Sequence, residues 1–545
     1  MTVRTATVFV FLVLIAACNQ ESKPPEPEAE ELESKAPELT IMARGAAIAG
    51  ANGIHFSPDN LLYVASVMGS NITVINPETG EIIRQLGAAE GVVGPDDLAF
   101  NSDGDFYWTS ILTGEVAGFT AGGERLVAAQ LAPGVNPITF SDDGRLFVSQ
   151  CFFGVNLYEL DPKGTQPARL ISDQLGPGCG LNGMDWGPDE RLYGPRWFTG
   201  EIVSFNVDDN SMRVEATGFK TPAAVKFNSK NELHVMDTGT GEIFKLGADE
   251  RSVIATLTPG LDNFTFDEND NLFVSSFVDG FVKRVEKDGS STDLLPSGMA
   301  HPAGITLWEN QIVVADSNSI HFFNKTSGEL ELIQRNVFSV GEMGGAINLA
   351  ADGSNLILVS WFDNDVRVWD PKAEKVIERY SGLAAPTAAV RYSGKLIATE
   401  HGNQRVVSLG ESGVTELFSM EAPTGMSVHG GSLYVTDREL GRIYRIGSNH
   451  ELLAQPEVVV EGLDAPEGVA ASDDGFIVME AAKGNIVAIS EQGERQLLAN
   501  IPAGSEAATN DQPPSMFFNG VGLDADGTIY VTGEASRMLY KISRP

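Results

Sequence analysis

The 545-residue chain is poor in cysteine, histidine and basic side chains, with 3 Cys, 7 His and 37 Lys and Arg against 74 Asp and Glu. The net charge of −37 is spread along the chain, which disfavours nucleic acid and anionic lipid surfaces as partners and favours a cation. Helix-length amphipathic patterns are absent, which excludes a helical bundle. We find no serine-hydrolase elbow, Walker loop, haem motif or zinc-ligand cluster, which excludes the reactions that depend on them.

The first 18 residues have the pattern of an export signal. Arg4 precedes an apolar run at 8–17 that is too short to span a bilayer as a helix and that stops at Cys18. The tetrad Ile-Ala-Ala-Cys at 15–18 resembles the lipobox of bacterial lipoproteins, which implies cleavage before Cys18 and a lipid on the new amino terminus. The alternative is an ordinary secretory signal with an incidental cysteine. Asn19 implies an outer-membrane address, so the expected location is the bacterial cell envelope.

One pattern recurs at intervals of about 40 residues from Asn52 to the carboxyl end. Each copy has two short strands of alternating apolar residues joined by a turn such as Asp-Gly, which predicts a four-stranded antiparallel sheet. A sheet of this size cannot bury both faces alone, whereas sheets stacked radially around an axis can. The sequence therefore predicts an all-β fold of twelve propeller blades, which begin at ANGIHF, PDDLAF, VNPITF, LNGMDW, PAAVKF, LDNFTF, PAGITL, GGAINL, PTAAVR, PTGMSV, PEGVAA and FNGVGL.

The ends of the array indicate how the blades are grouped. The last copy stops after its third strand, while orphan strands precede the first copy, at Leu39–Ala43, and the seventh, at Thr292–Pro296. We expect Leu39–Ala43 to complete the sixth blade and Thr292–Pro296 the twelfth, because this closes two rings of six. A single twelve-bladed ring would leave a wide hole at its axis. The predicted domains are a signal peptide at 1–18, a disordered acidic tether at 19–38, and tandem six-bladed β-propellers at 39–289 and 290–545.

The repeat resembles the senescence marker protein and gluconolactonase family, with its strictosidine synthase-like and NHL-repeat relatives. The segment LNGMDWGPDERLYG is similar to that family's PNG-strand-DG-LYV unit, and the resemblance covers nearly all of the chain after the tether. It implies a site at one mouth of the axial channel, which we term the upper face. Because propellers host many unrelated reactions, the resemblance implies the fold more specifically than the reaction.

In such blades the residue just before the inner strand faces the channel. In the first ring, five of these six positions carry a side-chain oxygen, and the sixth is Ala223. Calcium takes about six to eight oxygens from carboxylates, amides and water, so a divalent-metal site is predicted, with Ca²⁺ as the expected ion. The alternative is that these side chains bond to their own turn backbone. The predicted ligands are Asn52, Asp96, Asn136, Asn182 and Asp262.

Residues that end the second strand of each blade are expected at the same mouth. Arg196 is a candidate for pairing with a substrate carboxylate or a developing oxyanion. Asp237 is the candidate general base on a metal-bound water, with Asp97 as the alternative. Hydrogen bonding between blades is the structural alternative for each. Cys151 and Cys179 fall in adjoining upper loops, so we expect a disulfide that would stabilise the loop presenting Asn182.

The second ring offers a weaker set of channel ligands. The segment TEHGNQRVVSL resembles the TE-GNRI phrase of streptogramin lyases, which implies a possible lyase site with His401 as base. The alternative for His401 is a solvated loop residue. The residues of this alternative site are Glu400, His401, Asp437, Glu467 and Glu480.

The resulting hypothesis is a metal-dependent hydrolase of lactones or esters in the first ring. The gluconolactonase-like enzymes carry a Glu where this chain has Asn52 and an Asp where it has Ala223, so the family's own lactonase activity does not transfer directly. The competing hypothesis is a non-enzymatic envelope scaffold that binds a protein or a glycan. The expected membrane contact is through the lipid anchor alone.

Overall fold

The computed structural model describes residues 36–247, 250–337, 343–509 and 512–544. Within them the chain forms twelve four-stranded antiparallel sheets and one short 3₁₀ turn, η1 (Ala88–Glu90). The predicted signal peptide, Cys18 and most of the predicted tether lie outside the described residues. None of the described segments is a helix long and apolar enough to cross a membrane.

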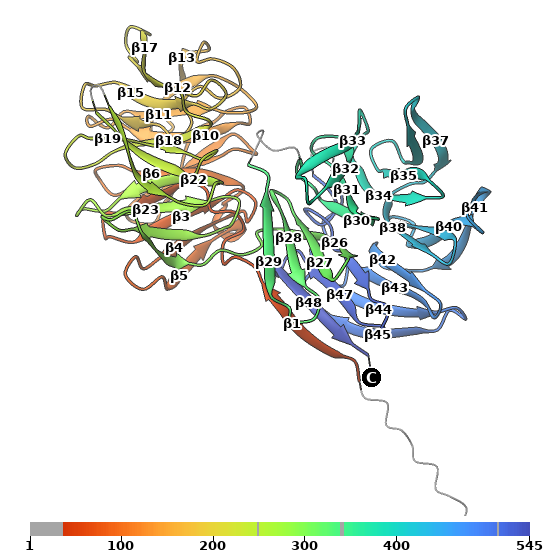
Figure 1. The fold of residues 1–545 in the computed structure, drawn as a ribbon. Helices are drawn as coiled ribbons and strands as arrows, with labels where there is room; N and C mark the ends of the chain where they lie inside the picture. Colours follow the sequence, from red (N-terminus) through yellow and green to blue (C-terminus); the bar gives the residue numbers. More distant parts are fainter. Residues whose placement is uncertain (1–35, 248–249, 338–342, 510–511, 545) are drawn as a thin grey trace, which may run out of the picture. The chain divides into compact units, whose positions relative to one another are not determined.

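Ring 1 consists of the six sheets from β2 to β25 (Figure 1). Its strands are β2 (Ile54–Phe56), β3 (Leu62–Ser66), β4 (Asn71–Ile75), β5 (Ile82–Leu86), β6 (Pro95–Phe100), β7 (Phe106–Ser110), β8 (Glu115–Phe119), β9 (Arg125–Gln130), β10 (Val135–Phe140), β11 (Leu146–Gln150), β12 (Leu157–Leu160), β13 (Arg169–Ser172), β14 (Asp185–Trp186), β15 (Leu192–Arg196), β16 (Glu201–Phe205), β17 (Met212–Thr217), β18 (Pro222–Phe227), β19 (Leu233–Asp237), β20 (Glu242–Leu246), β21 (Arg251–Thr256), β22 (Leu261–Phe266), β23 (Leu272–Ser276), β24 (Val282–Val285) and β25 (Ser291–Leu295).

Ring 2 consists of the six sheets from β26 to β48, together with β1. Its strands are β26 (Pro302–Trp308), β27 (Gln311–Asp316), β28 (Ser319–Asn324), β29 (Leu330–Arg335), β30 (Asn348–Asp352), β31 (Asn355–Ser360), β32 (Asp365–Asp370), β33 (Lys375–Ser381), β34 (Pro386–Tyr392), β35 (Lys395–Glu400), β36 (Arg405–Gly410), β37 (Gly413–Ser419), β38 (Pro423–His429), β39 (Ser432–Asp437), β40 (Arg442–Ser448), β41 (Glu451–Glu461), β42 (Pro466–Ser472), β43 (Gly475–Glu480), β44 (Asn485–Ser490), β45 (Arg495–Asn500), β46 (Val521–Leu523), β47 (Ile529–Gly533), β48 (Met538–Ser543) and β1 (Glu38–Arg44).

The innermost strands contact one another in two closed cycles of six, which confirms the prediction of tandem six-bladed propellers. The middle strands of the blades, such as β3 and β7, are buried along their whole length, whereas outer strands such as β5 are mostly exposed. Apolar side chains of adjacent blades pack face to face, as Val74 of the first blade and Trp108 of the second do in one core cluster. Each blade therefore buries both faces against its two neighbours.

A hydroxyl group on the second strand links many blades to the next. A serine or threonine donates a hydrogen bond to a backbone carbonyl at the start of the following blade's inner strand. Two of these bonds join blades far apart in sequence and close the rings: Ser275 to Asn52 in ring 1 and Thr532 to Ala303 in ring 2. The described residues contain six bonds of this type: Thr109 to Asn136, Ser149 to Leu181, Ser275 to Asn52, Thr399 to Thr424, Thr436 to Glu467 and Thr532 to Ala303.

The assignment of the two orphan strands was wrong. β1 pairs antiparallel with β48 and completes the twelfth blade, with Ile41 opposite Tyr540 (Figure 1). β25 pairs with β24 and completes the sixth blade, with Thr292 opposite Arg284. A boundary between residues 289 and 290 therefore divides the sixth sheet. The last blade takes the amino-terminal strand because its own repeat supplies three strands.

This strand order can be tested by hydrogen exchange on two matched proline variants. Ile41→Pro removes a backbone donor from β1, so exchange should become about tenfold faster or more in β48 and stay unchanged in β24. Thr292→Pro in β25 should have the reverse effect. Faster exchange of β24 in the Ile41→Pro variant would contradict the assignment.

Candidate functional site

The upper end of the ring 1 channel is formed by the residues that precede or open the six inner strands. Asp96, Asn136 and Asn182 are each less than a tenth exposed, while Asn52 and Asp262 are half-buried. The Nδ2 of Asn52 donates to Oδ1 of Asp262 at 3.1 Å, which joins the first blade to the sixth. The structure therefore gathers at least part of the predicted ligand set at the axis.

Asp96, which is buried, and Asp262, which is half-buried, form a pair of like charges. Burial raises the pKa of Asp96 well above its ordinary value, and the negative charges of Asp262 and Asp97 raise it further. Burial also raises the pKa of Asp262 to about 7, against a lowering effect of the hydrogen bond from Asn52. In the part of the chain that the structure describes, Asp96 accepts no hydrogen bond through its carboxylate and neither acid has a lysine or arginine partner. No positive charge from the described residues therefore balances the two carboxylates.

The amide groups of this set are partly free. Asn52 uses its Oδ1 to accept the backbone N–H of Val67 at 3.0 Å. Across the described ranges, Asn136 has no side-chain hydrogen bond, and the nearest polar contact of Asn182 Oδ1 is the sulfur of Cys151 at 3.9 Å. No group of three or more His, Cys, Asp or Glu among the described residues has a metal-binding arrangement. A cation here would therefore depend on amide oxygens as well as the two carboxylates.

Asp97 lies one residue further along the same strand and is 3% exposed. Its carboxylate accepts the backbone N–H groups of Leu98 and Ile138 and the side-chain amide of Asn263, at 2.9 to 3.3 Å. Burial raises its pKa, while the charge of Lys226 lowers it. The glycine at the same register of the first blade, Gly53, leaves room for this carboxylate, because a Cβ there would lie 2.4 Å from Asp97 Oδ1.

Residues at the end of the second strand mostly anchor the loop that leads into their own blade. Asp237 is 1% exposed, and its carboxylate accepts the backbone N–H groups of Lys220, Thr221 and Gly239 at 2.6 to 3.0 Å. These donors make Asp237 an anchor of its loop. The carboxylates whose charges act on Asp96 are those of Asp262 and Asp97, so Asp97 rather than Asp237 lies beside the predicted ligands. The same anchoring is made by Ser66, Ser110, Gln150, Ser276, Asp316, Glu400, Asp437 and Glu480.

Arg196 pairs with a neighbouring strand. Its Nη1 lies 2.9 Å from Glu201, and the side chain of Arg196 is 17% exposed. Its guanidinium therefore already has a carboxylate partner within the blade. The predicted disulfide is confirmed, because Cys151 and Cys179 are bonded with a Cα separation of 4.1 Å. The bridge lies beside Asn182 and fixes the entry to the fourth blade.

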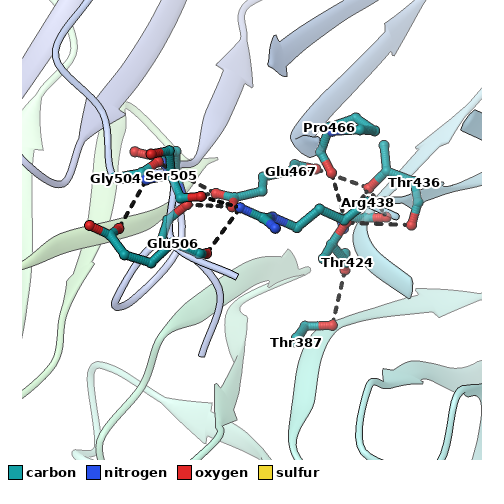
Figure 2. A network of polar contacts seen from close by, with 12 residues as sticks. Thr387, Thr424, Thr436, Arg438, Pro466, Glu467, Gly504, Ser505 and Glu506 are labelled. Carbon is teal, nitrogen blue, oxygen red and sulfur yellow. Dashed lines mark hydrogen bonds and ion pairs between the residues drawn. The ribbon is translucent and has the colours of Figure 1, made fainter. Parts of the chain in front are cut away.

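In ring 2 an arginine side chain lies beside a buried glutamate at the corresponding level (Figure 2). Glu467 is fully buried, and its carboxylate contacts Arg438 Nε at 3.1 Å, Ser515 Oγ at 2.6 Å and Asn519 Nδ2 at 2.8 Å. Burial raises the pKa of Glu467, and the positive charge of Arg438 lowers it. Arg438 also donates to the carbonyl oxygens of Ser505 and Glu506, at 2.9 and 3.0 Å. The guanidinium thus neutralises this carboxylate and holds the loop before β46.

That loop also covers the channel residues of ring 2 with apolar side chains. Phe517 and Phe518 are 1% and 2% exposed and pack with Ala303, Ile347 and Trp361. The insertion before the last repeat is visible in the sequence, but its packing is not. The upper end of the ring 2 channel is therefore filled by Phe517 and Phe518 of this loop.

Among the remaining residues of the alternative site, the charges of Asp437 and Arg438 act on His401, whereas Glu400 and Glu480 anchor loops. Glu400 accepts from the backbone of Ala384 and pairs with Arg405, so it is a structural group. His401 packs against Trp361 at 5.6 Å between ring centroids, and its Nδ1 has no partner in the described chain. Burial and the charge of Arg438 lower the pKa of His401.

Sequence reasoning missed a second group of polar residues, at the lower end of the ring 1 channel. His55, Asp185 and Lys226 stand at one register of three inner strands, each directly before an aromatic residue. All three line a single cavity. The signal was present in the repeats IHF, MDW and VKF, as an ionisable residue where other repeats carry Ala or Thr.

No protein-family model matches the chain, and no curated protein matches it. Among solved structures, the chain is similar to virginiamycin B lyase from Staphylococcus aureus, with 14% identity, a TM-score of 0.38, and coverage of 51% of this chain and 96% of the lyase. A gluconolactonase from Xanthomonas campestris shares 18% identity over 47% of this chain and 93% of its own, with a TM-score of 0.37. The extracellular domain of a putative one-component system from B. thetaiotaomicron shares 10% identity over 93% of this chain and 82% of its own, with a TM-score of 0.32. These values describe a resemblance among propellers and assign no reaction to this chain.

Proposed function

We propose that ring 1 binds a divalent cation, Ca²⁺ first, at the upper end of its channel and hydrolyses a small lactone or ester there. The observation that carries the proposal is the pair Asp96 and Asp262, which has no positive partner among the described residues. A cation would relieve both the desolvation and the mutual repulsion of this pair. Asn136 and Asn182 supply the neutral oxygens of such a site, while Asn52 holds Asp262 through its Nδ2.

The comparison of the two rings supports this proposal. In ring 2 the buried Glu467 is neutralised by Arg438, a residue of the chain itself. In ring 1 the equivalent level has two carboxylates and no such residue within the described segments. The two rings therefore differ. In ring 2 a residue of the chain balances the charge of the buried acid, and in ring 1 no described residue does so.

The chemistry assigned to the site follows from its groups. A divalent cation would polarise a substrate carbonyl and lower the pKa of a bound water. Asp97 is the candidate general base, because it lies beside the carboxylates of Asp96 and Asp262 and burial raises its pKa. The Ile138, Leu98 and Asn263 donors fix the orientation of Asp97. Asp237 and Arg196 position loops and strands in this scheme and do not take part in proton transfer.

The same proposal places the chain in the bacterial envelope, anchored through a lipid on Cys18. The disulfide between Cys151 and Cys179 supports an oxidising compartment, since disulfides are rare in the cytoplasm. A substrate in that compartment would reach the site by diffusion from outside the cytoplasm.

Cation binding is tested by melting the chelator-treated protein with and without Ca²⁺ or Mn²⁺. We expect an increase of about 5 °C at roughly 100-fold excess over the Kd, because a ligand that binds the folded state alone stabilises it. Asp96→Ala combined with Asn182→Ala should abolish the increase. Asp103→Asn, an exposed turn residue of the same blade as Asp96, serves as the matched control and should keep it. Equal increases in both variants would refute the site.

Hydrolysis is tested with the cation-loaded protein on a panel of lactones and aryl esters. We expect turnover by the wild type. Asp97→Asn should lower the rate about 100-fold or more and should keep the cation-dependent increase in melting temperature. If the cation binds and no substrate of the panel turns over, the hydrolase assignment is wrong. The cation would then be a structural element of a binding scaffold.

The pH dependence of the metal-free protein follows from Asp262, whose pKa is about 7 against an ordinary value of 3.8. Because the pKa is higher in the folded than in the unfolded state, the folded protein binds this proton more tightly. The resulting stabilisation of the folded state is complete below about pH 4 and is lost as the pH rises through 7. Between pH 5 and pH 8 the melting temperature should fall, and Asp262→Asn should flatten that fall. Ca²⁺ should stabilise more at pH 8 than at pH 5, because protons compete for the same oxygens. Parallel pH profiles of the wild type and Asp262→Asn would contradict this account.

A further inference from the structure

A cavity of about 250 Å³ lies at the lower end of the ring 1 channel, below the level of the predicted cation ligands. Its walls include the residue directly before the closing aromatic of every inner strand, so all six blades contribute one side chain at the same level. Three of these side chains are half-buried and three are buried. The six residues are His55, Ala99, Thr139, Asp185, Lys226 and Thr265.

Three polar groups of the cavity have hydrogen-bonding capacity that the described residues do not use. Lys226 donates through Nζ to the carbonyl of Met184 at 3.3 Å and forms no ion pair in the described part of the chain. Thr139 and Thr265 are 7% and 6% exposed, yet neither hydroxyl has a hydrogen bond to any described residue. Each of these groups therefore has hydrogen-bonding capacity left for a ligand in the cavity.

His55 adds an acceptor to the same cavity. Its Nδ1 lies 2.7 Å from the carbonyl oxygen of Phe56. A carbonyl only accepts, so Nδ1 carries the proton and Nε2 is left with a free lone pair. Burial and the charge of Lys226 lower the pKa of His55 to about 4, which keeps the ring neutral at physiological pH.

Asp185 adds a second acceptor. Its two oxygens each accept one backbone N–H, from Trp186 at 3.0 Å and from Phe227 at 2.8 Å. Each carboxylate oxygen has a further lone pair available. Asp185 is therefore held rigidly by the backbone of two neighbouring blades and can still accept from a ligand.

We propose that this cavity binds a neutral polyhydroxylated molecule of monosaccharide size. Sugar hydroxyls both donate and accept, which matches an ammonium, two hydroxyls, an imidazole acceptor and a carboxylate on one surface. The positive charge of Lys226 repels a cationic ligand, and the negative charges of Asp185 and the nearby Asp97 repel an anionic one. The volume is below that of drug-sized pockets, and aromatic walls suit the C–H face of a sugar ring. Those walls are Phe100, Phe140, Phe227 and Phe266.

The corresponding level of ring 2 shows that the fold does not require such a site. No ionisable residue occurs there, since its six positions hold Thr306, Ala350, Val390, Ser427, Ala470 and Gly522. The hydroxyls of Thr306 and Ser427 accept the backbone N–H groups of Ala351 and Ala471, at 3.2 and 3.0 Å. In ring 2 these hydroxyls are satisfied by the next blade, whereas in ring 1 they face the cavity unpaired.

The test is calorimetric and ligand-observed NMR titration of the full chain with a matched set of hexoses. Glucose, galactose and mannose are the neutral probes, glucuronate the anionic probe and glucosamine the cationic one. We expect saturable binding of at least one neutral hexose. Lys226→Met and Asp185→Asn should each weaken it about tenfold or more, because each removes a hydrogen bond to a charged group.

Two further variants keep the test decisive if a charged variant folds poorly. Thr139→Val and Thr265→Val preserve shape and remove an unpaired hydroxyl, so they should lower affinity without lowering the melting temperature. Ser427→Ala, at the same register of ring 2, is the matched control and should leave hexose affinity unchanged. The proposal is overturned if no neutral hexose binds, if glucuronate or glucosamine alone binds, or if the ring 1 variants keep wild-type affinity.

Discussion

The hydrogen bond from a second-strand hydroxyl to the first residues of the next blade is the constraint on which the rest of this structure depends. It acts on the backbone of the residues that face the channel, as when Thr109 contacts the carbonyl of Asn136 and Ser275 that of Asn52. Packing between blades is apolar and non-directional, whereas a hydrogen bond joins two particular atoms. The levels of the channel, and with them the two clusters of polar side chains in ring 1, follow from these bonds.

The two rings use one scaffold and differ in how they treat buried charge. Ring 2 satisfies its channel internally, through Arg438 at the upper level and through next-blade N–H groups on Thr306 and Ser427 at the lower level. In the described part of ring 1, the carboxylate of Asp96 at the upper level and the hydroxyls of Thr139 and Thr265 at the lower level form no hydrogen bond with the chain, and Lys226 forms one. Polar groups with unused hydrogen-bonding capacity along the channel are the reason that ring 1 is the proposed ligand-binding ring.

The blades and the channel positions could be predicted from the sequence because both follow from a repeat. Asn52, Asp96 and Asp262 were found by aligning the start of each inner strand, and the disulfide followed from the position of two loops. The role of Asp237 could not be found in this way, because its three partners are backbone N–H groups that every sequence has. The pairing of the orphan strands was equally hidden, since β1 and β25 are both short apolar strands and either blade could accept either one by local pattern. The lower cavity was not predicted, because the family resemblance implies a site at the upper mouth alone.

The pairing of β1 with β48 has a consequence for how the chain is made. Thr40 and Lys541 are 501 residues apart and meet in one sheet, whereas every sheet of ring 1 is built from contiguous repeats. During vectorial synthesis the blades of ring 1 can form as they emerge, but the final blade must wait until the last residues are released. The amino-terminal strand therefore remains an unpaired edge for nearly the whole time of synthesis, and a truncated product would carry that edge permanently exposed.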